Sequence, residues 1–294
     1  MTKQPLVSII MPTYNRKHLI KRSIDSCLQQ AYHNIELIIC DDHSTDGTEE
    51  YIVEFKKKDR RVKYCKTPIG HKGANAARNA GIQIAKGKYL CFLDSDDELL
   101  ENGILDRVNV FEKNPKAGMV YGNALCQISG KKMPWVYEDI PSTKREARKY
   151  LLKEMSLCIQ STIMLRTKVF DKIGLLDERQ KGWTDDGVVV AVGLKFPVIH
   201  CQKFVVIIHA SKINMTNNKI NMYQGLSVLI KKYKKEIIRE VSVRRYLLWQ
   251  IRLLSAFCYA KEMTANSEKM RYVWGVLHRG LRYIWHRDFK HKFE

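Results

Sequence analysis

The sequence predicts an α/β protein: a Rossmann-like, mostly parallel sheet flanked by helices and followed by a basic helical appendage. Apolar, β-branched runs alternate with segments of helical spacing over residues 6–93. Polar motifs at 12–15, 41–48 and 94–97 each follow the end of such a run. From about residue 223 onward the pattern is helical and rich in lysine and arginine.

The first part of the chain is expected to alternate strands and helices. Its apolar runs predict strands at 6–11, 35–40, 62–66 and 88–93. Helical spacing and turn residues predict helices at 16–30, from the turn at 44–48 to about 57, and at 74–85. This order implies parallel strands with helices on both faces. Because ligands bind beyond the carboxyl ends of such strands, the three polar motifs are expected to line one crevice.

The second part is predicted to continue this pattern less regularly. Helices are expected at 102–113, 168–173 and 186–194, and strands at 118–123, 161–166 and 198–208. Residues 129–150 are polar and contain prolines, so they are expected to form a variable loop or lid.

The charge of the chain points to an acidic partner. Its 294 residues carry a formal net charge of +20. Residues 219–294 hold 17 Lys and Arg against 6 Asp and Glu, so this tail is more basic per residue than the rest. Nucleic acid, an anionic membrane face and phosphorylated substrates would all suit such a charge. The tail has no recognisable nucleic-acid motif, so nucleic acid is not the expected partner.

Cysteine usage and hydropathy favour a cytoplasmic protein. None of the eight cysteines lies in a Cys-x-x-Cys pair, and this scatter is typical of a reducing compartment. The N-terminus lacks the apolar region of a signal peptide, and no stretch approaches the roughly 20 apolar residues of a membrane span. We therefore expect a cytoplasmic location, with a peripheral one at the inner face of the plasma membrane as the alternative.

Three carboxylates close the fourth predicted strand. Asp94, Asp96 and Asp97 follow the apolar run directly, with only Ser95 between the first two. Carboxylates this close repel one another unless a cation lies among them. Hard oxygen ligands suit Mn²⁺ or Mg²⁺, and these ions in turn hold phosphates. The segment therefore predicts a divalent metal gripping a diphosphate; the alternative is a solvated acidic turn.

Four ordered motifs resemble those of family 2 glycosyltransferases. They are Val-Ser-Ile-Ile-Met-Pro-Thr-Tyr-Asn at 7–15, Asp-Asp-His-Ser-Thr-Asp-Gly-Thr at 41–48, Ala-Arg-Asn-Ala-Gly at 77–81 and Phe-Leu-Asp-Ser-Asp-Asp at 92–97. Segments 174–178 and 183–186 resemble the acceptor side of that family. The resemblance covers roughly residues 5–210 and implies a GT-A fold, a nucleotide-diphosphate-sugar donor and inversion at the anomeric carbon.

The resemblance also implies a division of the chain. Residues 1–210 would form the catalytic domain, with a nucleotide-sugar half at about 1–100 and an acceptor half at about 101–210. Residues 211–294 would form the helical basic C-terminal region.

Several positions acquire donor-side roles from the resemblance. Asp94 would face the ribose, Ser95 would lie beside it in the nucleotide-sugar site, and Asp96 would bind the metal that bridges the diphosphate. The stretch Pro12, Thr13 and Tyr14 would surround the nucleoside, where Tyr14 offers stacking; ordinary turn chemistry is the alternative.

Two further residues would contact the nucleotide. Asp41 would accept a hydrogen bond from the base N3–H, which favours uracil or thymine. Arg78 would reach a phosphate or the base, or would instead form a salt bridge to a nearby acid.

The acceptor side would supply the base. Inversion at a hydroxyl acceptor needs a carboxylate that takes the hydroxyl proton, and Asp186 lies at the family position. Asp185 would add a like charge, although acids at a helix start also act as caps. Trp183 would form an apolar wall for the acceptor sugar or belong to the core. His209 would ligate the metal or be structural.

The chain departs from the family pattern in two ways. His43 replaces the glycine common in that turn, so the backbone of the loop is expected to differ. No Gln-x-x-Arg-Trp motif follows, which argues against a processive synthase and favours transfer of one sugar per encounter.

The tail leaves three interpretations open. Apolar residues recur at helical spacing, and arginines, tryptophans and tyrosines lie among them. This composition suits an anionic membrane surface, as a lipid-linked acceptor would require. It equally suits a helical appendage that packs on the catalytic domain or on a second subunit of a homo-oligomer.

Taken together, the motifs predict a metal-dependent, inverting, non-processive glycosyltransferase. It would move a hexosyl or N-acetylhexosaminyl group from a nucleotide-diphosphate sugar, with a UDP-sugar favoured, to a hydroxyl of a surface polysaccharide or lipid-linked glycan. Transfer to a polyprenyl phosphate is the alternative reaction. A nucleic-acid-binding protein and a non-catalytic nucleotide-sugar binder are the rivals from other classes.

Overall fold

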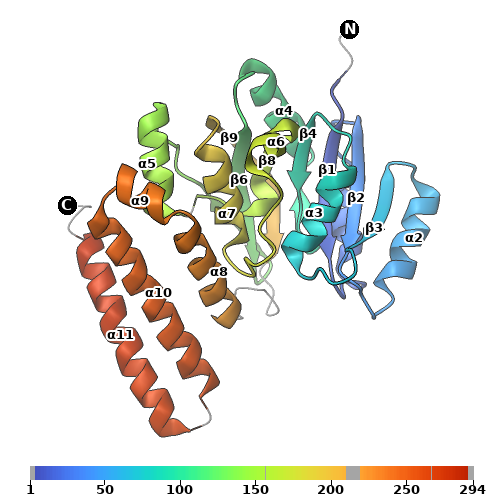
Figure 1. The fold of residues 1–294 in the computed structure, drawn as a ribbon. Helices are drawn as coiled ribbons and strands as arrows, with labels where there is room; N and C mark the ends of the chain where they lie inside the picture. The colour runs from blue at the N-terminus through green and yellow to red at the C-terminus, as the bar shows by residue number, and fades with distance from the viewer. Residues whose placement is uncertain (1–3, 156, 210–218, 266, 291–294) are drawn as a thin grey trace.

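A computed structural model describes residues 4–155, 157–209, 219–265 and 267–290. Within these residues nine strands form one sheet in the order β3-β2-β1-β4-β8-β6-β9-β5, and β7 pairs with β6 beside this path. Helices flank the sheet, and the last two helices lie side by side at one end of the molecule (Figure 1).

The nucleotide half has the predicted alternation of strands and helices. Its elements are β1 (Val7–Thr13), α1 (Ile20–Leu28), β2 (Ile35–Asp41), α2 (Thr48–Lys58), β3 (Val62–Lys66), α3 (Ala74–Ile84) and β4 (Tyr89–Phe92). All four strands run parallel. Every residue of β1, β2 and β4 is buried, which explains why these strands appear in the sequence as unbroken apolar runs. The predicted parallel order is confirmed.

The acceptor half is mixed in strand direction. Antiparallel β8 lies between β4 and β6, whereas β6 and β9 are parallel. Its elements are β5 (Glu98–Leu99), α4 (Gly103–Lys113), β6 (Met119–Ile128), β7 (Lys131–Trp135), α5 (Lys144–Glu154), η1 (Gln160–Thr162), β8 (Ile163–Arg166), η2 (Thr167–Val169), α6 (Phe170–Ile173), α7 (Thr184–Gly193) and β9 (Val198–His209).

The prediction of a variable loop or lid at 129–150 was wrong. The segment holds β7, which pairs with β6, and the start of α5. Thr143 caps α5 by accepting a hydrogen bond from the Glu146 backbone N–H, and Leu151 and Leu152 bury the inner face of the helix. The polar surface of this helix hides its amphipathic pattern from composition alone.

The C-terminal region is helical, as predicted. It contains α8 (Lys219–Lys232), α9 (Lys234–Glu240), α10 (Val243–Thr264) and α11 (Glu268–Lys290). A second buried cluster joins it to α5 and α7 of the acceptor half. Its members are Leu152, Met155, Val190, Leu194, Leu226, Leu229, Ile230, Tyr233, Ile237, Leu248 and Trp249. The domain boundary at 210/211 stays a prediction, because residues 210–218 lie outside the described residues.

None of the helices in the described part of the chain combines the length and the apolar character that crossing a bilayer requires.

Candidate active site

The loops that follow β1 and β2 are tied together. The Asn15 backbone N–H donates to Ser44 Oγ at 2.9 Å, and the Thr45 N–H donates to Asn15 Oδ1 at 2.8 Å. Asn15 and His43 both adopt positive φ angles, 51° and 61°, which asparagine and histidine tolerate better than β-branched residues do. The first two polar motifs therefore meet beyond the strand ends, as the fold prediction required.

The first-strand motif offers one buried and one exposed group. Pro12 and Thr13 are buried, and Thr13 Oγ1 has no hydrogen-bond partner among the described residues. A buried hydroxyl without a partner is costly, so this atom fits a position that a polar ligand completes. Tyr14 is 56% exposed, which leaves its ring accessible for stacking.

Asp41 is hydrogen-bonded within the folded sheet and the loop that follows β2. Its side chain is fully buried. Its Oδ1 accepts hydrogen bonds from the Ser44 N–H at 3.0 Å and from Ser44 Oγ at 2.5 Å, while Oδ2 accepts from the Tyr64 hydroxyl at 3.0 Å. In this structure the carboxylate braces the loop, and the predicted contact between Asp41 and the base N3–H stays a prediction.

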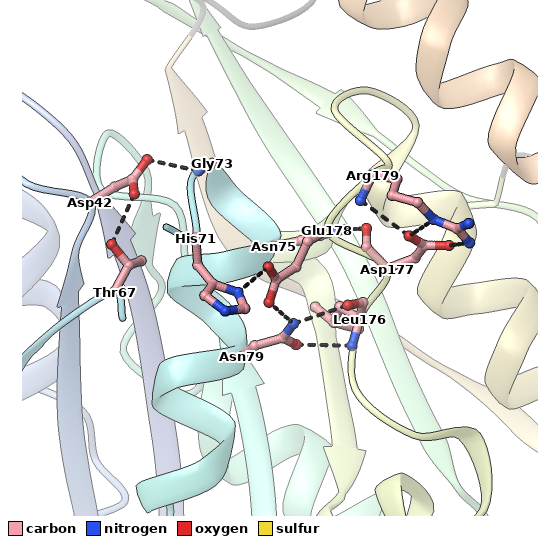
Figure 2. A network of polar contacts seen from close by, with 10 residues as sticks. All are labelled: Asp42, Thr67, His71, Gly73, Asn75, Asn79, Leu176, Asp177, Glu178 and Arg179. Carbon is pink, nitrogen blue, oxygen red and sulfur yellow. Dashed lines mark hydrogen bonds and ion pairs between the residues drawn. The ribbon is translucent and has the colours of Figure 1, made fainter. Parts of the chain in front are cut away.

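Asp42 is the partly exposed acid of this pair. It accepts hydrogen bonds from Thr67 Oγ1 at 3.0 Å and from the Gly73 N–H at 2.8 Å (Figure 2). The loop before α3 is thereby fixed at the side of the crevice.

Helix α3 carries Arg78 to the acid cluster. Arg78 Nη2 donates to Asp94 Oδ1 at 2.7 Å; the arginine side chain is 1% exposed and that of Asp94 is 40% exposed. The salt-bridge alternative for Arg78 is therefore present in the structure. A buried guanidinium that holds a half-exposed carboxylate fixes the orientation of Asp94 toward the crevice.

The other two acids after β4 differ in their surroundings. Burial and the charge of Asp94 raise the pKa of both Asp96 and Asp97. Asp97 accepts hydrogen bonds from Ser161 Oγ at 2.6 Å and from the His209 N–H at 3.3 Å, so it joins the end of β4 to η1 and β9. Asp96 Oδ2 lies 3.9 Å from Arg16 Nη2. Ser95 is buried between Asp94 and Asp96.

The metal prediction rests on this cluster. Among the described residues no group of three or more His, Cys, Asp or Glu side chains is arranged to hold an ion. His209 Nε2 lies 2.5 Å from Glu98 Oε1, so its ring is engaged by a carboxylate, and its role as a ligand stays a prediction. Three neighbouring acids, two of them with raised pKa values, nevertheless fit a cation that relieves their repulsion.

A polar network attaches the acceptor-side segment 174–178 to α3 (Figure 2). Asn79 bonds to both backbone groups of Leu176, at 2.9 Å each, and donates to Glu178 at 3.0 Å. Glu178 also lies 2.5 Å from His71 Nδ1. Since Arg78 is on the same helix, this network holds the acceptor segment in register with the acid cluster.

The start of α7 holds the predicted base. Trp183 adopts φ 55° and its carbonyl accepts from the Gln180 side chain. Burial, and next the charge of Asp94, raise the pKa of Asp185 to about 6, against the opposing effect of Arg78. Asp185 is thus electrostatically linked to the acid cluster. Asp186 is 8% exposed, and its charge acts on Arg252 of α10.

Two residues near this site were missed by sequence reasoning. Gln160 in η1 is 1% exposed, and neither side-chain amide atom has a partner among the described residues. Arg252 lies over the Trp183 ring, with 4.7 Å from its guanidinium carbon to the ring centroid. The predicted wall residue Trp183 is therefore covered by the tail. Neither residue belongs to a motif, so no local signal marks them.

Comparison with known proteins agrees with this geometry. A family model described as "Glycosyl transferase family 2" matches residues 8–174. A curated relative from Escherichia coli, "UDP-Glc:alpha-D-GlcNAc-diphosphoundecaprenol beta-1,3-glucosyltransferase WfgD", is 43% identical over 118 residues, which are 40% of this chain and 45% of that protein. The chain spans about half the length of the first curated relatives that it matches.

Solved structures share the fold. TarS 1–349 from S. aureus in complex with UDP-GlcNAc has a TM-score of 0.65 at 16% identity, covering 97% of this chain and 92% of that one. The mannosyltransferase PcManGT from Pyrobaculum calidifontis, in complex with GDP-Man and Mn²⁺, has a TM-score of 0.60 at 16% identity, covering 97% and 84%. The predicted GT-A fold class is confirmed.

Proposed function

The chain belongs to glycosyl transferase family 2, and from this premise we propose that it moves one hexosyl or N-acetylhexosaminyl group from a UDP-sugar to a hydroxyl of a lipid-linked glycan. The observation that carries the proposal is the convergence of the β1 loop, the acids after β4 and the acids of α7. The name of the WfgD relative specifies a UDP-Glc donor and a diphosphoundecaprenol-linked acceptor, which supports both substrate classes.

The donor is proposed to lie against the ends of β1 and β4. Tyr14 would stack on the base, and the unpartnered Thr13 hydroxyl would bond a polar group of the nucleoside. Asp94, held by Arg78, would accept hydrogen bonds from the ribose hydroxyls. Asp41 is proposed to accept a hydrogen bond from the base N3–H, and Asp42 is the more exposed of the two acids after β2.

The residues present fit a divalent metal. Asp96 would hold Mn²⁺ or Mg²⁺, with His209 as the second candidate ligand, and the repulsion among the neighbouring acids would fall on binding. Such an ion supplies charge stabilisation to the departing diphosphate. A neighbour of the same fold was solved with Mn²⁺, which supports this choice of ion.

The transfer is proposed as a single inverting displacement. The acceptor hydroxyl oxygen attacks the anomeric carbon from the face opposite the diphosphate. The bond from that carbon to the phosphate oxygen breaks, and its electron pair leaves with the nucleoside diphosphate. The hydroxyl proton passes to Asp186. Asp185, with its pKa raised to about 6, would lie beside the acceptor and contribute to the same pair of coupled carboxylates.

The tail is proposed to bring the site to the membrane. Exposed apolar side chains on α10 and α11 include Val243, Leu247, Leu254, Met270, Val273 and Leu277. Together with the basic surplus of the tail they suit an anionic membrane face, where a lipid-linked acceptor resides. Association of two copies through the same side chains is the alternative use of this surface.

One rival reaction is transfer to a polyprenyl phosphate, in which a phosphate oxygen is the nucleophile and no base is required. The neighbouring carboxylates of Asp185 and Asp186 at the start of α7 favour a hydroxyl acceptor, because a phosphate nucleophile would gain nothing from two nearby negative charges. Nucleic acid is not a proposed partner.

The decisive experiment has two steps. A thermal-shift screen of UDP, GDP and dTDP with and without Mn²⁺ should give the largest rise in Tm for UDP with metal, since a ligand that binds only the folded state stabilises it. Release of UDP from UDP-sugars should then depend on an added GlcNAc-diphosphate-lipid acceptor. A chain that binds none of the nucleotides contradicts the proposal.

A further inference from the structure

The C-terminal helices contact the start of α7 through Arg252. The guanidinium carbon of Arg252 on α10 lies 4.7 Å from the ring centroid of Trp183 and 4.9 Å from that of Trp249. The arginine is thus held between two indole rings, one from the acceptor half and one from the tail. Cation–π contacts of this kind strengthen when the cation is removed from water.

The same cation lies among acids of the acceptor half. Burial lowers the pKa of Arg252, while the charges of Asp186 and of Glu154 at the end of α5 raise it. An arginine stays protonated under these conditions, so its charge is permanent. A permanent positive charge therefore acts on the carboxylate that we propose as the base.

The packing around this contact is tight. Gly225 of α8 lies directly against the backbone of Gly182, and a Cβ added to Gly225 would overlap the Gly182 carbonyl. Trp249 is fully buried in the cluster that α10 shares with α5 and α7. The segment from Gly182 to Asp186 is thus contacted by the tail at Gly182 and at Trp183.

We propose that Arg252 is a positioning residue for Asp186, and that the C-terminal helices are therefore part of the catalytic machinery rather than an anchor alone. This inference rests on the proposed function. The guanidinium clamps Trp183 and attracts the Asp186 carboxylate, which fixes the first turn of α7. Lysine would keep the charge but lose the planar face that lies between the two rings.

The test compares three variants of the full chain. Arg252→Met should lower kcat about 10- to 100-fold, the size of effect expected when a reacting group is displaced by about 1 Å. The KM for the UDP-sugar and the affinity for UDP should stay within about twofold of wild type, because the donor residues are untouched. The kcat of Arg252→Lys should fall between those of Arg252→Met and wild type. Arg60→Met, an exposed arginine between α2 and β3, should match wild type.

A second readout is the pH profile. Asp186 interacts electrostatically with Arg252 on α10 and with Cys158 before η1. Glu154 on α5 also acts on Arg252, and Asp94 and Arg78 act on the neighbouring Asp185. Removing the charge of Arg252 should move the acidic limb of kcat/KM to higher pH, since an opposite charge favours an ionised carboxylate. Arg252→Lys, which keeps the charge, should leave that limb near its wild-type position.

The outcomes separate the two proposals. Wild-type kcat in Arg252→Met, or a parallel fall of kcat, UDP affinity and Tm, would overturn the role of Arg252. If Arg252→Met does not fold, Arg252→Gln takes its place, and a wild-type kcat and pH limb in folded Arg252→Gln would overturn the role of Arg252. A kcat of Arg252→Lys below that of wild type, with an unchanged pH limb, would support the contribution of the charge. A wild-type protein that binds UDP yet never transfers sugar would instead contradict the proposed function.

Discussion

The nucleotide half and the C-terminal helices are built on different principles. In the nucleotide half, strands β1, β2 and β4 are buried along their whole length, and a polar motif follows the end of each. The C-terminal helices bury one face, centred on Trp249, and leave Leu247 and Leu254 about half exposed. The first region thus fixes side chains for chemistry, whereas the second joins a packed interior to an apolar surface.

This difference shows which functional residues can be recognised from the sequence. Sites at strand ends appear as short contiguous motifs, because the turn and its polar residues are adjacent in sequence. The contribution proposed for the tail is instead an electrostatic interaction between single residues on distant elements, Arg252 on α10 and Asp186 on α7. Substitutions can test whether catalysis depends on the first region and structural support on the second.

The largest effect is expected from Asp96→Asn. Removing the acid that is proposed to hold the metal should lower transfer about 1,000-fold or more, because charge stabilisation of the leaving diphosphate is lost. The Mn²⁺-dependent rise in Tm with UDP should vanish as well. Transfer rates and thermal shifts measure both effects. Asp171→Asn, an exposed acid on α6, is the matched control, and metal-dependent transfer by Asp96→Asn would contradict the assignment.

Most of the nucleotide half could be predicted from the sequence, because the patterns that mark its elements are local. Apolar runs, turn residues and the acids at 94–97 are each readable within a few positions. The hydrogen bond between Asp41 and Tyr64 could not be predicted from local sequence, because Tyr64 belongs to β3, which packs beside β2 only in the folded sheet. Helix α5 was hidden because its exposed face is polar and only Leu151 and Leu152 of its residues are fully buried.

Asp186→Asn should have the next largest effect. Without a group to take the hydroxyl proton, kcat should fall about 100- to 1,000-fold while UDP affinity stays near wild type. Steady-state kinetics with a hydroxyl acceptor and calorimetric titration of UDP measure the two quantities. A variant that retains nearly full activity would favour a phosphate nucleophile and the polyprenyl-phosphate alternative.

Asp185→Asn should stabilise the protein while it weakens activity. Burial and Asp94 raise the pKa of Asp185 to about 6, so the folded state binds this proton more tightly than the unfolded state does. The cost of ionising the group therefore appears as pH rises from about 4 to about 6 and is fully present above it. Asparagine removes that cost, so the free energy of unfolding at pH 7.5 should rise by about 1–3 kcal/mol. Denaturation at pH 4 should show almost no difference, and equal gains at both pH values would contradict the cause.

The smallest effect is expected where the tail meets α5. Arg148 Nε donates to Glu240 Oε2 at 2.8 Å, and hydrogen bonds from Arg148 and Arg239 lower the pKa of Glu240 to about 2. A lowered pKa means that the stabilisation is present above about pH 4.5 and is lost as pH falls toward 2. Glu240→Gln should therefore cost about 1 kcal/mol at pH 7 and little at pH 2.

The location of that loss would sharpen the contrast between the two regions. Hydrogen exchange should quicken in α9 and α10 of Glu240→Gln but remain unchanged in β1, β2 and β4, because the tail and the nucleotide half bury separate clusters. The exposed pair Glu54 and Lys57 on α2 provides the control, and Glu54→Gln should leave exchange in both regions as in wild type. Faster exchange throughout the sheet would mean that the tail supports the whole molecule. In that case, a loss of activity in Arg252 variants would have to be interpreted as a loss of stability of the whole molecule.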